Sequence, residues 1–226
     1  MRPRTTGNAM TRTTRVLLTG FEPFDGERTN PSWEAVRDAA ASPPDGLEIT
    51  AVELPCVYGR SRTALREAVA AHDPDLVLCV GQAGGRPDLT VERVAVNIDD
   101  ARIPDVSGAQ PIDEPVVPGG PAAYFAALPV KACVAAVREA GLPASVSNTA
   151  GTFVCNHVFY DLMHLIATER PALRGGFVHV PYAPGQVTGR SLPSLPVSAV
   201  AEGLRVIAAT AARTNTDIKV VGGATH

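Results

Sequence analysis

The chain has 226 residues, a formal net charge of −3 and 45% apolar residues. This length and apolar content suit one globular domain with a substantial core. Charges of both signs are mixed along the chain, which argues against a basic nucleic-acid surface or a polybasic membrane patch. No apolar run approaches the roughly 20 residues of a membrane span. We therefore expect no nucleic acid and no membrane among its partners, and favour a small neutral or peptidic ligand.

The four cysteines, Cys56, Cys79, Cys133 and Cys155, are widely spaced along the chain. They form no C-x-x-C pair and lack the density of a secreted disulfide scaffold. Reduced thiols and a cytoplasmic protein are therefore expected.

The two ends of the chain are expected to lie outside a single domain at 15–212. Residues 1–14 carry arginines and threonines but no apolar segment, so we predict a disordered basic leader rather than a secretory signal. The true start is either Met1 or Met10. Residues 213–226 are predicted to be a frayed tail.

Short apolar segments alternate with helical patterns along the domain. Strands are predicted at 15–20, 47–54, 76–80, 144–147 and 175–181, and helices from Pro31 onward and at 59–72, 129–140, 156–170 and 198–210. This alternation predicts an α/β fold, in which helices cover both faces of a parallel sheet. Ligands of such sheets bind beyond the carboxyl ends of the strands.

Several connections stand out at that end of the sheet. Phe21 and Phe24 follow the first strand and form either a small apolar cluster or an aromatic ligand wall. The glycine-rich turn 81–86 matches no nucleotide-binding motif. The alternating pattern of residues 90–98 predicts an extra strand or an extended arm. The long Pro/Gly-rich segment 106–121 is expected to be a lid or a subunit contact.

The stretch 147–157 is a loop of small and polar residues that leads directly into a predicted helix. Cys155 would lie in the first turn of that helix, near unpaired N–H groups and the positive end of the macrodipole. This position is expected to lower the pKa of its thiol and suits a nucleophile. The alternative is a buried structural cysteine, as most free cysteines are.

A cysteine nucleophile needs a base within hydrogen-bond reach. His157 and His164 lie on the opposite side of the helix from the cysteine, because successive residues are rotated by about 100°. His72 lies at the other end of the sheet, and His226 lies in the tail. His179, near the carboxyl end of its strand, is therefore the predicted base.

A third group is needed to orient the base, and three acids qualify. Glu92, Asp99 and Asp100 all follow the glycine-rich turn, and geometry alone does not choose among them. Each is otherwise an ordinary surface acid or an ion-pair partner of Arg93 or Arg102.

A metal site is a rival interpretation of the same helix. His157, Asp161 and His164 share one helix face, as metal ligands can. The spacing differs from H-E-x-x-H and no fourth ligand is evident, so we expect no metal and no cofactor.

With these residues in place, the chain resembles pyroglutamyl peptidase type I, or pyrrolidone-carboxylate peptidase, a family of cysteine peptidases. The motifs that carry the resemblance lie at 17–24 with 30–33, 81–85, 92–97, 99–105, 147–157 and 175–181. The similarity extends from about Val16 to about Thr210.

The resemblance implies a catalytic triad of Glu92, Cys155 and His179, and thus favours Glu92 over the two aspartates. It also implies a three-layer α/β/α sandwich around a mostly parallel, twisted sheet. Members of the family are often tetrameric, so a homotetramer or a dimer is expected.

The implied reaction removes an amino-terminal 5-oxoproline (pyroglutamate) from a peptide through a thioester on Cys155. His179 would protonate the leaving amine and then activate water. The Cys155 backbone N–H and Arg102 are the predicted oxyanion donors.

The implied substrate pocket must recognise an uncharged lactam. Phe21, Phe24 and Phe153 are the expected aromatic walls around the ring. Asn30 and the backbone of Gln82 are expected to bind the lactam C=O and N–H, although Asn30 is alternatively only a helix cap.

Three other functions remain open at this point. The first is another cysteine amidohydrolase acting on a free amide, and the second is a catalytically silent binding protein on the same fold. The third is a metal-dependent hydrolase.

Overall fold

The computed structural model of the chain describes residues 12–223. In chain order its elements are β1 (Thr14–Phe21), α1 (Pro31–Ala41), β2 (Leu47–Leu54), α2 (Arg60–His72), β3 (Leu76–Gln82), β4 (Leu89–Glu92), β5 (Val94–Val96), β6 (Ala123–Phe125), α3 (Val130–Glu139), β7 (Ala144–Ser147), α4 (Val154–Thr168), β8 (Arg174–Val180), the short 3-10 helix η1 (Pro184–Val187) and α5 (Val197–Arg213). The predicted leader lies outside the described residues up to residue 11.

Six of the strands form one sheet in the order β2-β1-β3-β8-β4-β7. The strands β2, β1, β3 and β8 are parallel, whereas β4 is antiparallel to β8 and parallel to β7. The sheet is therefore mostly parallel, as predicted. The extra strand expected at 90–98 is divided in two, because β4 joins the main sheet and β5 pairs with β6 in a separate antiparallel ribbon.

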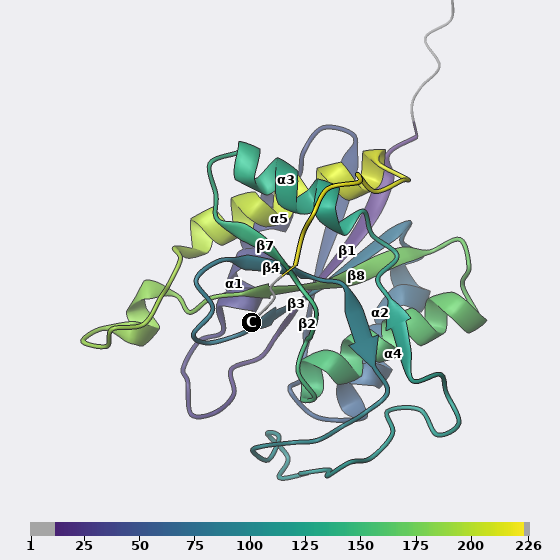
Figure 1. Cartoon of the computed structure of the whole chain (residues 1–226), viewed down its shortest axis with the longest axis vertical. Coiled ribbons are helices and arrows are strands. Elements are labelled where there is room, and N and C mark those ends of the chain that lie inside the picture. Colours follow the sequence, from purple (N-terminus) through teal and green to yellow (C-terminus); the bar gives the residue numbers. More distant parts are fainter. Residues whose placement is uncertain (1–11, 224–226) are drawn as a thin grey trace, which may run out of the picture.

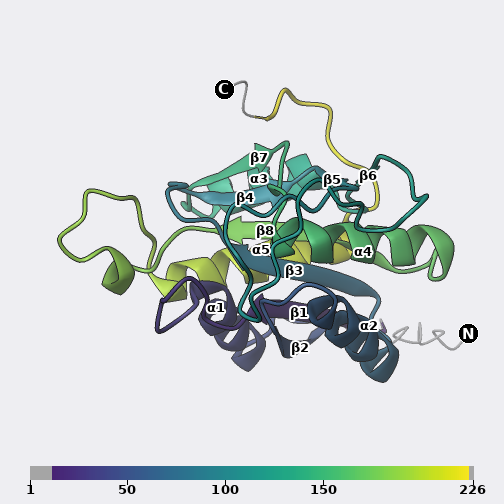
Figure 2. The same ribbon diagram turned by 90° about the horizontal axis from the view of Figure 1, so that it is seen from below.

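Helices cover both faces of the sheet, which confirms the three-layer α/β/α sandwich (Figures 1 and 2). One core lies between the sheet and α1, α3 and α5, and the other lies between the sheet and α2 and α4. Because side chains alternate along a strand, Leu78 and Val80 of β3 enter the first core, and Val77 and Cys79 enter the second.

The glycine-rich turn begins later than the sequence predicted. Gly81 and Gln82 continue β3 because they pair with His179 and Val180 of β8. No helix within residues 12–223 is long and apolar enough to cross a membrane.

The described residues after α5 contact the start of α3. The Asp217 carboxylate accepts hydrogen bonds from the backbone N–H groups of Lys131 and Ala132, at 3.0 and 2.9 Å. These N–H groups lie in the first turn of α3, whose N-cap residue Pro129 offers no side-chain cap. The tail therefore caps a helix that has no cap of its own.

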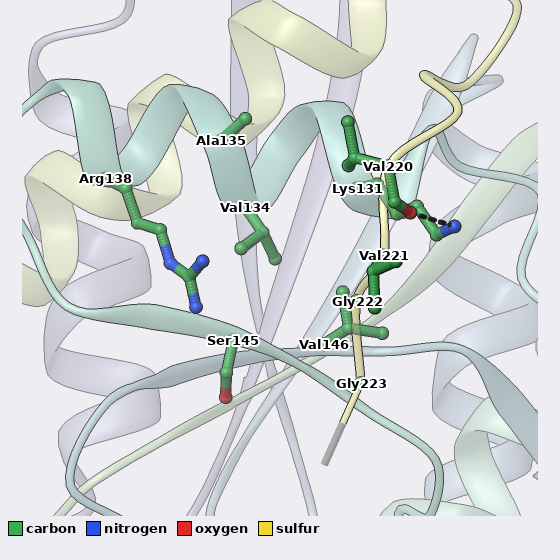
Figure 3. Close-up of a pocket in the computed structure, with 10 residues that line it drawn as sticks. All are labelled: Lys131, Val134, Ala135, Arg138, Ser145, Val146, Val220, Val221, Gly222 and Gly223. Atoms are coloured by element: carbon green, nitrogen blue, oxygen red, sulfur yellow. Dashed lines mark hydrogen bonds between the residues drawn. The ribbon is translucent and has the colours of Figure 1, made fainter. Parts of the chain in front are cut away.

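A cavity of about 350 Å³ lies between α3, β7 and the tail (Figure 3). Its basic side chains are tied to the backbone, since Lys131 Nζ donates to the Val220 carbonyl at 2.5 Å and Arg138 Nε donates to the Ala144 carbonyl at 2.7 Å. The cavity is on the α3 side of the sheet. It is thus separate from the candidate site, which lies on the α4 side.

Candidate active site

Three residues of the sheet face α4, because side chains alternate between the two faces of a sheet along each strand. Val91 and Val178 belong to the core under α3 and α5, so the neighbouring Glu92 and His179 face the other way. Gly81, which pairs with His179 in the register of β3 and β8, lies on the same face. The sheet therefore presents a glycine, a carboxylate and an imidazole beneath the start of α4.

Cys155 lies in the first turn of α4, as predicted. A Cβ atom added at Gly81 would lie 2.7 Å from its Sγ, well inside van der Waals contact. The missing side chain of Gly81 thus makes room for the thiol against the sheet. Cys155 is partly exposed, whereas the other three cysteines are buried.

The strand directions differ from the parallel arrangement that suggested the site. His179 lies near the carboxyl end of β8, as expected, but Glu92 ends a strand that runs the opposite way. The two side chains meet because Thr90 is paired with His179, and Glu92 is two residues farther along on the same face.

The imidazole of His179 is bound to one of the three candidate acids. Its Nδ1 lies 2.8 Å from Glu92 Oε1, and both side chains are buried. Asp99 instead lies 2.8 Å from His157 Nδ1, and the backbone N–H of Asp100 donates to the Thr152 carbonyl. The structure therefore brings only Glu92, of these three acids, to the imidazole.

Arg86 also binds Glu92, a contact that sequence reasoning missed. Its Nη1 lies 2.6 Å from Oε1 of Glu92, the oxygen that also contacts His179. Burial raises the pKa of Glu92, but the hydrogen bond and charge of His179, together with the charge of Arg86, outweigh burial and leave the pKa lowered. Glu92 is therefore an ionised acceptor, and His179 donates to it from Nδ1–H.

The resting protonation states follow from burial. Burial lowers the pKa of His179, and the charge of Arg86 adds to this, against the opposing effect of Glu92. Burial likewise raises the pKa of Cys155, and the neighbouring Cys56 and Glu92 raise it further. The expected lowering of the thiol pKa by the helix terminus is thus wrong. Thiol and imidazole rest as a neutral pair, in which His179 Nε2 can accept a proton.

A cavity of about 420 Å³ opens above this pair. The predicted site residues that line it are Phe24, Gln82, Arg102, Phe153, Cys155 and His179. The rings of Phe24 and Phe153 are 6.3 Å apart, centre to centre. The space combines an apolar wall with a thiol, an imidazole and the guanidinium of Arg102.

Phe21 and Asn30 are not brought to this cavity. Phe21 is buried in the core under α2 and α4, with its ring centre 6.4 Å from that of Phe177. Asn30 Oδ1 accepts from the Ser32 N–H and Nδ2 donates to the Glu22 carbonyl, each at 3.0 Å. The amide of Asn30 is therefore used as a helix cap, which was the alternative interpretation.

The rival metal ligands each have a different partner. His157 contacts Asp99, Asp161 accepts from Arg66, and His164 contacts Tyr124. Within residues 12–223, no three His, Cys, Asp or Glu side chains are grouped as metal ligands. No residue of 106–121 lines the cavity, so its role as a lid or subunit contact stays a prediction.

A cysteine at a helix start that shares a cavity with a carboxylate-bound histidine, on a three-layer α/β/α fold, is typical of a cysteine hydrolase. Residues 14–214 match the model of the pyroglutamyl peptidase family. The chain belongs to the pyroglutamyl peptidase family, as the sequence motifs predicted.

Curated relatives and solved structures agree with this assignment. The pyrrolidone-carboxylate peptidase of Streptomyces coelicolor is 69% identical over 94% of this chain and 100% of the relative, and that of Erwinia tasmaniensis is 54% identical over 94% and 99%. The crystal structure of pyroglutamyl peptidase I from Bacillus amyloliquefaciens has a TM-score of 0.90 and 48% identity, covering 92% of this chain and 99% of that one. A mutant pyrrolidone carboxyl peptidase from Pyrococcus furiosus gives 0.84 and 39%, covering 88% and 98%.

Proposed function

We propose that this chain is a cysteine exopeptidase that hydrolyses the amide bond after an amino-terminal 5-oxoproline. The observation that carries the proposal is the common cavity of Cys155 and His179, with His179 held by an ionised Glu92. Family membership supplies the substrate class.

Acylation begins from the neutral pair. As Cys155 Sγ attacks the 5-oxoprolyl carbonyl carbon, its proton passes to His179 Nε2. The ionised Glu92 stabilises the imidazolium that forms and keeps Nδ1 protonated. The imidazolium then protonates the leaving nitrogen, the C–N bond breaks, and a thioester remains on Sγ. Water, deprotonated by His179, hydrolyses the thioester and releases 5-oxoproline.

The negative charge on the tetrahedral oxygen needs hydrogen-bond donors. The backbone N–H of Cys155 lies in the first turn of α4, where N–H groups lack intrahelical partners. Arg102 lines the same cavity and has no hydrogen bond or ion pair with any residue in the described range. We assign these two groups as the oxyanion donors.

The lactam ring would lie against Phe24 and Phe153. Gln82 lines the cavity at the end of β3, where its backbone suits the lactam N–H and C=O. Phe21 and Asn30 act indirectly, since Phe21 supports the floor and Asn30 caps α1. A site that hydrogen-bonds the lactam should reject proline, which lacks the ring carbonyl.

The test compares release of a fluorescent amine from 5-oxoprolyl and prolyl amides by wild type and Cys155→Ser, in reductant and chelator. Cys133→Ser, at a buried cysteine far from the cavity, is the matched control. We expect turnover of the 5-oxoprolyl amide alone, lost in Cys155→Ser and kept in Cys133→Ser. Folded wild type without turnover would refute the peptidase. Ammonia release from simple amides would instead indicate another amidohydrolase.

We further propose that the enzyme acts in the cytoplasm as a homo-oligomer, a tetramer or a dimer. Reduced thiols support the location, since Cys155 must stay reduced to act. The exposed side chain of Phe125 on the β5–β6 ribbon suits a subunit contact. Light scattering of wild type and Phe125→Ser tests the assembly, and a wild-type monomer would refute it.

A further inference from the structure

Arg86 joins two parts of the site that are distant in sequence. Its Nη1 lies 2.6 Å from Glu92 Oε1 and 2.5 Å from Thr90 Oγ1, both on β4. Its Nη2 donates to the Thr149 carbonyl at 2.9 Å, in the loop that leads to Cys155. One guanidinium therefore bridges the carboxylate that holds the base and the loop that carries the nucleophile.

The loop is organised around that same carbonyl. The Thr149 carbonyl also accepts from Ser147 Oγ at 3.0 Å, and the Thr149 hydroxyl accepts from the Gly151 N–H at 3.0 Å. Only two residues, Thr152 and Phe153, separate Gly151 from the start of α4. A shift of the Thr149 carbonyl would consequently move the thiol relative to His179.

We propose that Arg86 is a positioning residue of the reaction. Its two terminal nitrogens hold the Glu92–His179 pair and the loop before Cys155 in a fixed position relative to each other. This inference rests on the proposed function, because it assigns Arg86 to that reaction. Arg86 suits the role since a planar guanidinium presents several donors in fixed geometry, whereas a lysine ammonium is a single point. Arg86 does not contact the reacting atoms in this assignment.

Charge supports the geometry. The cation lowers the pKa of Glu92, of His179 and of Cys155, in each case beside a larger effect of burial. Removing it should therefore raise the pKa of both the base and the nucleophile. Other groups near the thiol are Cys56 and Cys79. Those around the cavity are Asp25, Glu27, Asp100, Arg102 and Tyr182.

The test uses Arg86→Gln and Arg86→Lys, with Arg93→Gln as the matched control. Arg93 directly follows Glu92, but its Nη2 donates to the Gly222 carbonyl of the tail. We would measure kcat and KM for the 5-oxoprolyl amide against pH. Inactivation by iodoacetamide against pH would report the thiol without any substrate. Thermal unfolding would confirm that each variant folds.

We expect Arg86→Gln to lower kcat about 10- to 100-fold, as misplaced reacting groups do, with a smaller change in KM. Both the acid limb of kcat/KM and the alkylation profile should move to higher pH. Arg86→Lys should keep the wild-type pH profiles, because the charge remains, and still lose kcat because one ammonium cannot bridge both partners. Arg93→Gln should match wild type.

Two results would overturn the assignment. One is a folded Arg86→Gln with kcat within about twofold of wild type and unmoved alkylation and rate profiles. The other is Arg86→Lys with full kcat, which would reduce Arg86 to a charge and refute the bridge; this variant decides the matter if Arg86→Gln does not fold. Wild type without turnover but with an alkylation profile that shifts in Arg86→Gln would refute the proposed substrate and support only the electrostatic link between Arg86 and the thiol, and an alkylation rate that also falls in Arg86→Lys would then support the bridge.

Discussion

Two buried histidine–carboxylate pairs lie within residues 12–223, and only one of them lines the cavity with Cys155. His179 and Glu92 are joined at 2.8 Å, and His157 and Asp99 are joined at the same distance through the same ring nitrogen. All four side chains are buried. Hydrogen-bond length and burial therefore do not distinguish a base from a structural histidine.

The difference lies at the second ring nitrogen. His157 Nε2 accepts the Gly59 N–H at 3.4 Å, and the ring meets Tyr58 edge to face, with centres 5.3 Å apart. No described residue makes a hydrogen bond to His179 Nε2, and His179 lines the cavity with Cys155. A carboxylate-bound imidazole can act as a base only where its other nitrogen is open to a reacting group.

Replacing each histidine by asparagine should separate the two pairs most strongly. We expect His179→Asn to lower kcat about 10²- to 10⁴-fold, because the general base is lost. His157→Asn should keep kcat within about threefold and lower the free energy of unfolding by about 1–3 kcal/mol, since Asp99 is left buried with a poorer partner. Amine release and urea unfolding measure the two effects. Equal losses of kcat would break the distinction.

A larger residue at position 81 should crowd the Cys155 thiol and lower activity without affecting the His157–Asp99 pair. An alanine Cβ at position 81 would lie 2.7 Å from Cys155 Sγ and 2.9 Å from Phe177 Cζ. We expect Gly81→Ala to lower kcat about 10- to 100-fold through displacement of the thiol. Gly185→Ala is the control, because nothing lies within 4 Å of its added Cβ. Steady-state kinetics of both variants decide, and full activity of Gly81→Ala would contradict the placement of Cys155.

The pH profile should report His179 and not His157. Catalysis needs neutral His179, so kcat/KM should rise with pH through its pKa and be lost below it. Because burial lowers the pKa of His179, the midpoint of the acid limb should lie below the usual histidine pKa of 6.5. Rates from pH 4 to 9 would test this, with enzyme recovered to neutral pH to exclude acid unfolding. A limb that moves in His157→Asn would reverse the assignment.

Asp217 serves as a comparison for the two histidine-bound carboxylates, because its carboxylate accepts hydrogen bonds from backbone N–H groups and not from a histidine. Asp217→Ala removes the acceptors of two N–H groups of α3 and should cost about 1 kcal/mol, as helix caps do. The melting temperature should fall by roughly 2–4 °C with kcat unchanged. Asp217→Asn keeps one acceptor oxygen and should lose less. An unchanged melting temperature in Asp217→Ala would show that the tail does not cap α3.

Periodicity and local chemistry were enough to predict the layers and most element positions. The strands at 47–54 and 144–147 were predicted with the bounds that the structure has, and Cys155 was placed in the first turn of its helix. Helical rotation excluded His157 as the base for Cys155. These features depend on residues close together in the chain, where the rules of rotation and alternation apply directly.

The choice among Glu92, Asp99 and Asp100 needed more than local geometry. The family motifs favoured Glu92, and the structure shows that it is the acid in contact with His179. The reason is long-range, since β4 runs antiparallel to β8 and its alternation then turns Glu92 toward the imidazole. Strand direction in a sheet is set by pairing partners far along the chain, which no local pattern reveals.

Sequence therefore determined that this chain is an α/β protein with a cysteine at a helix start and a histidine near a strand end. Tertiary structure alone revealed the bridge of Arg86, the capping of α3 by Asp217 and the raised pKa of Cys155. Each of these depends on burial or on contacts between distant segments. The periodicity of helices and strands can be read from neighbouring residues, whereas the desolvation of a side chain and its contact partners are set only when the chain has folded.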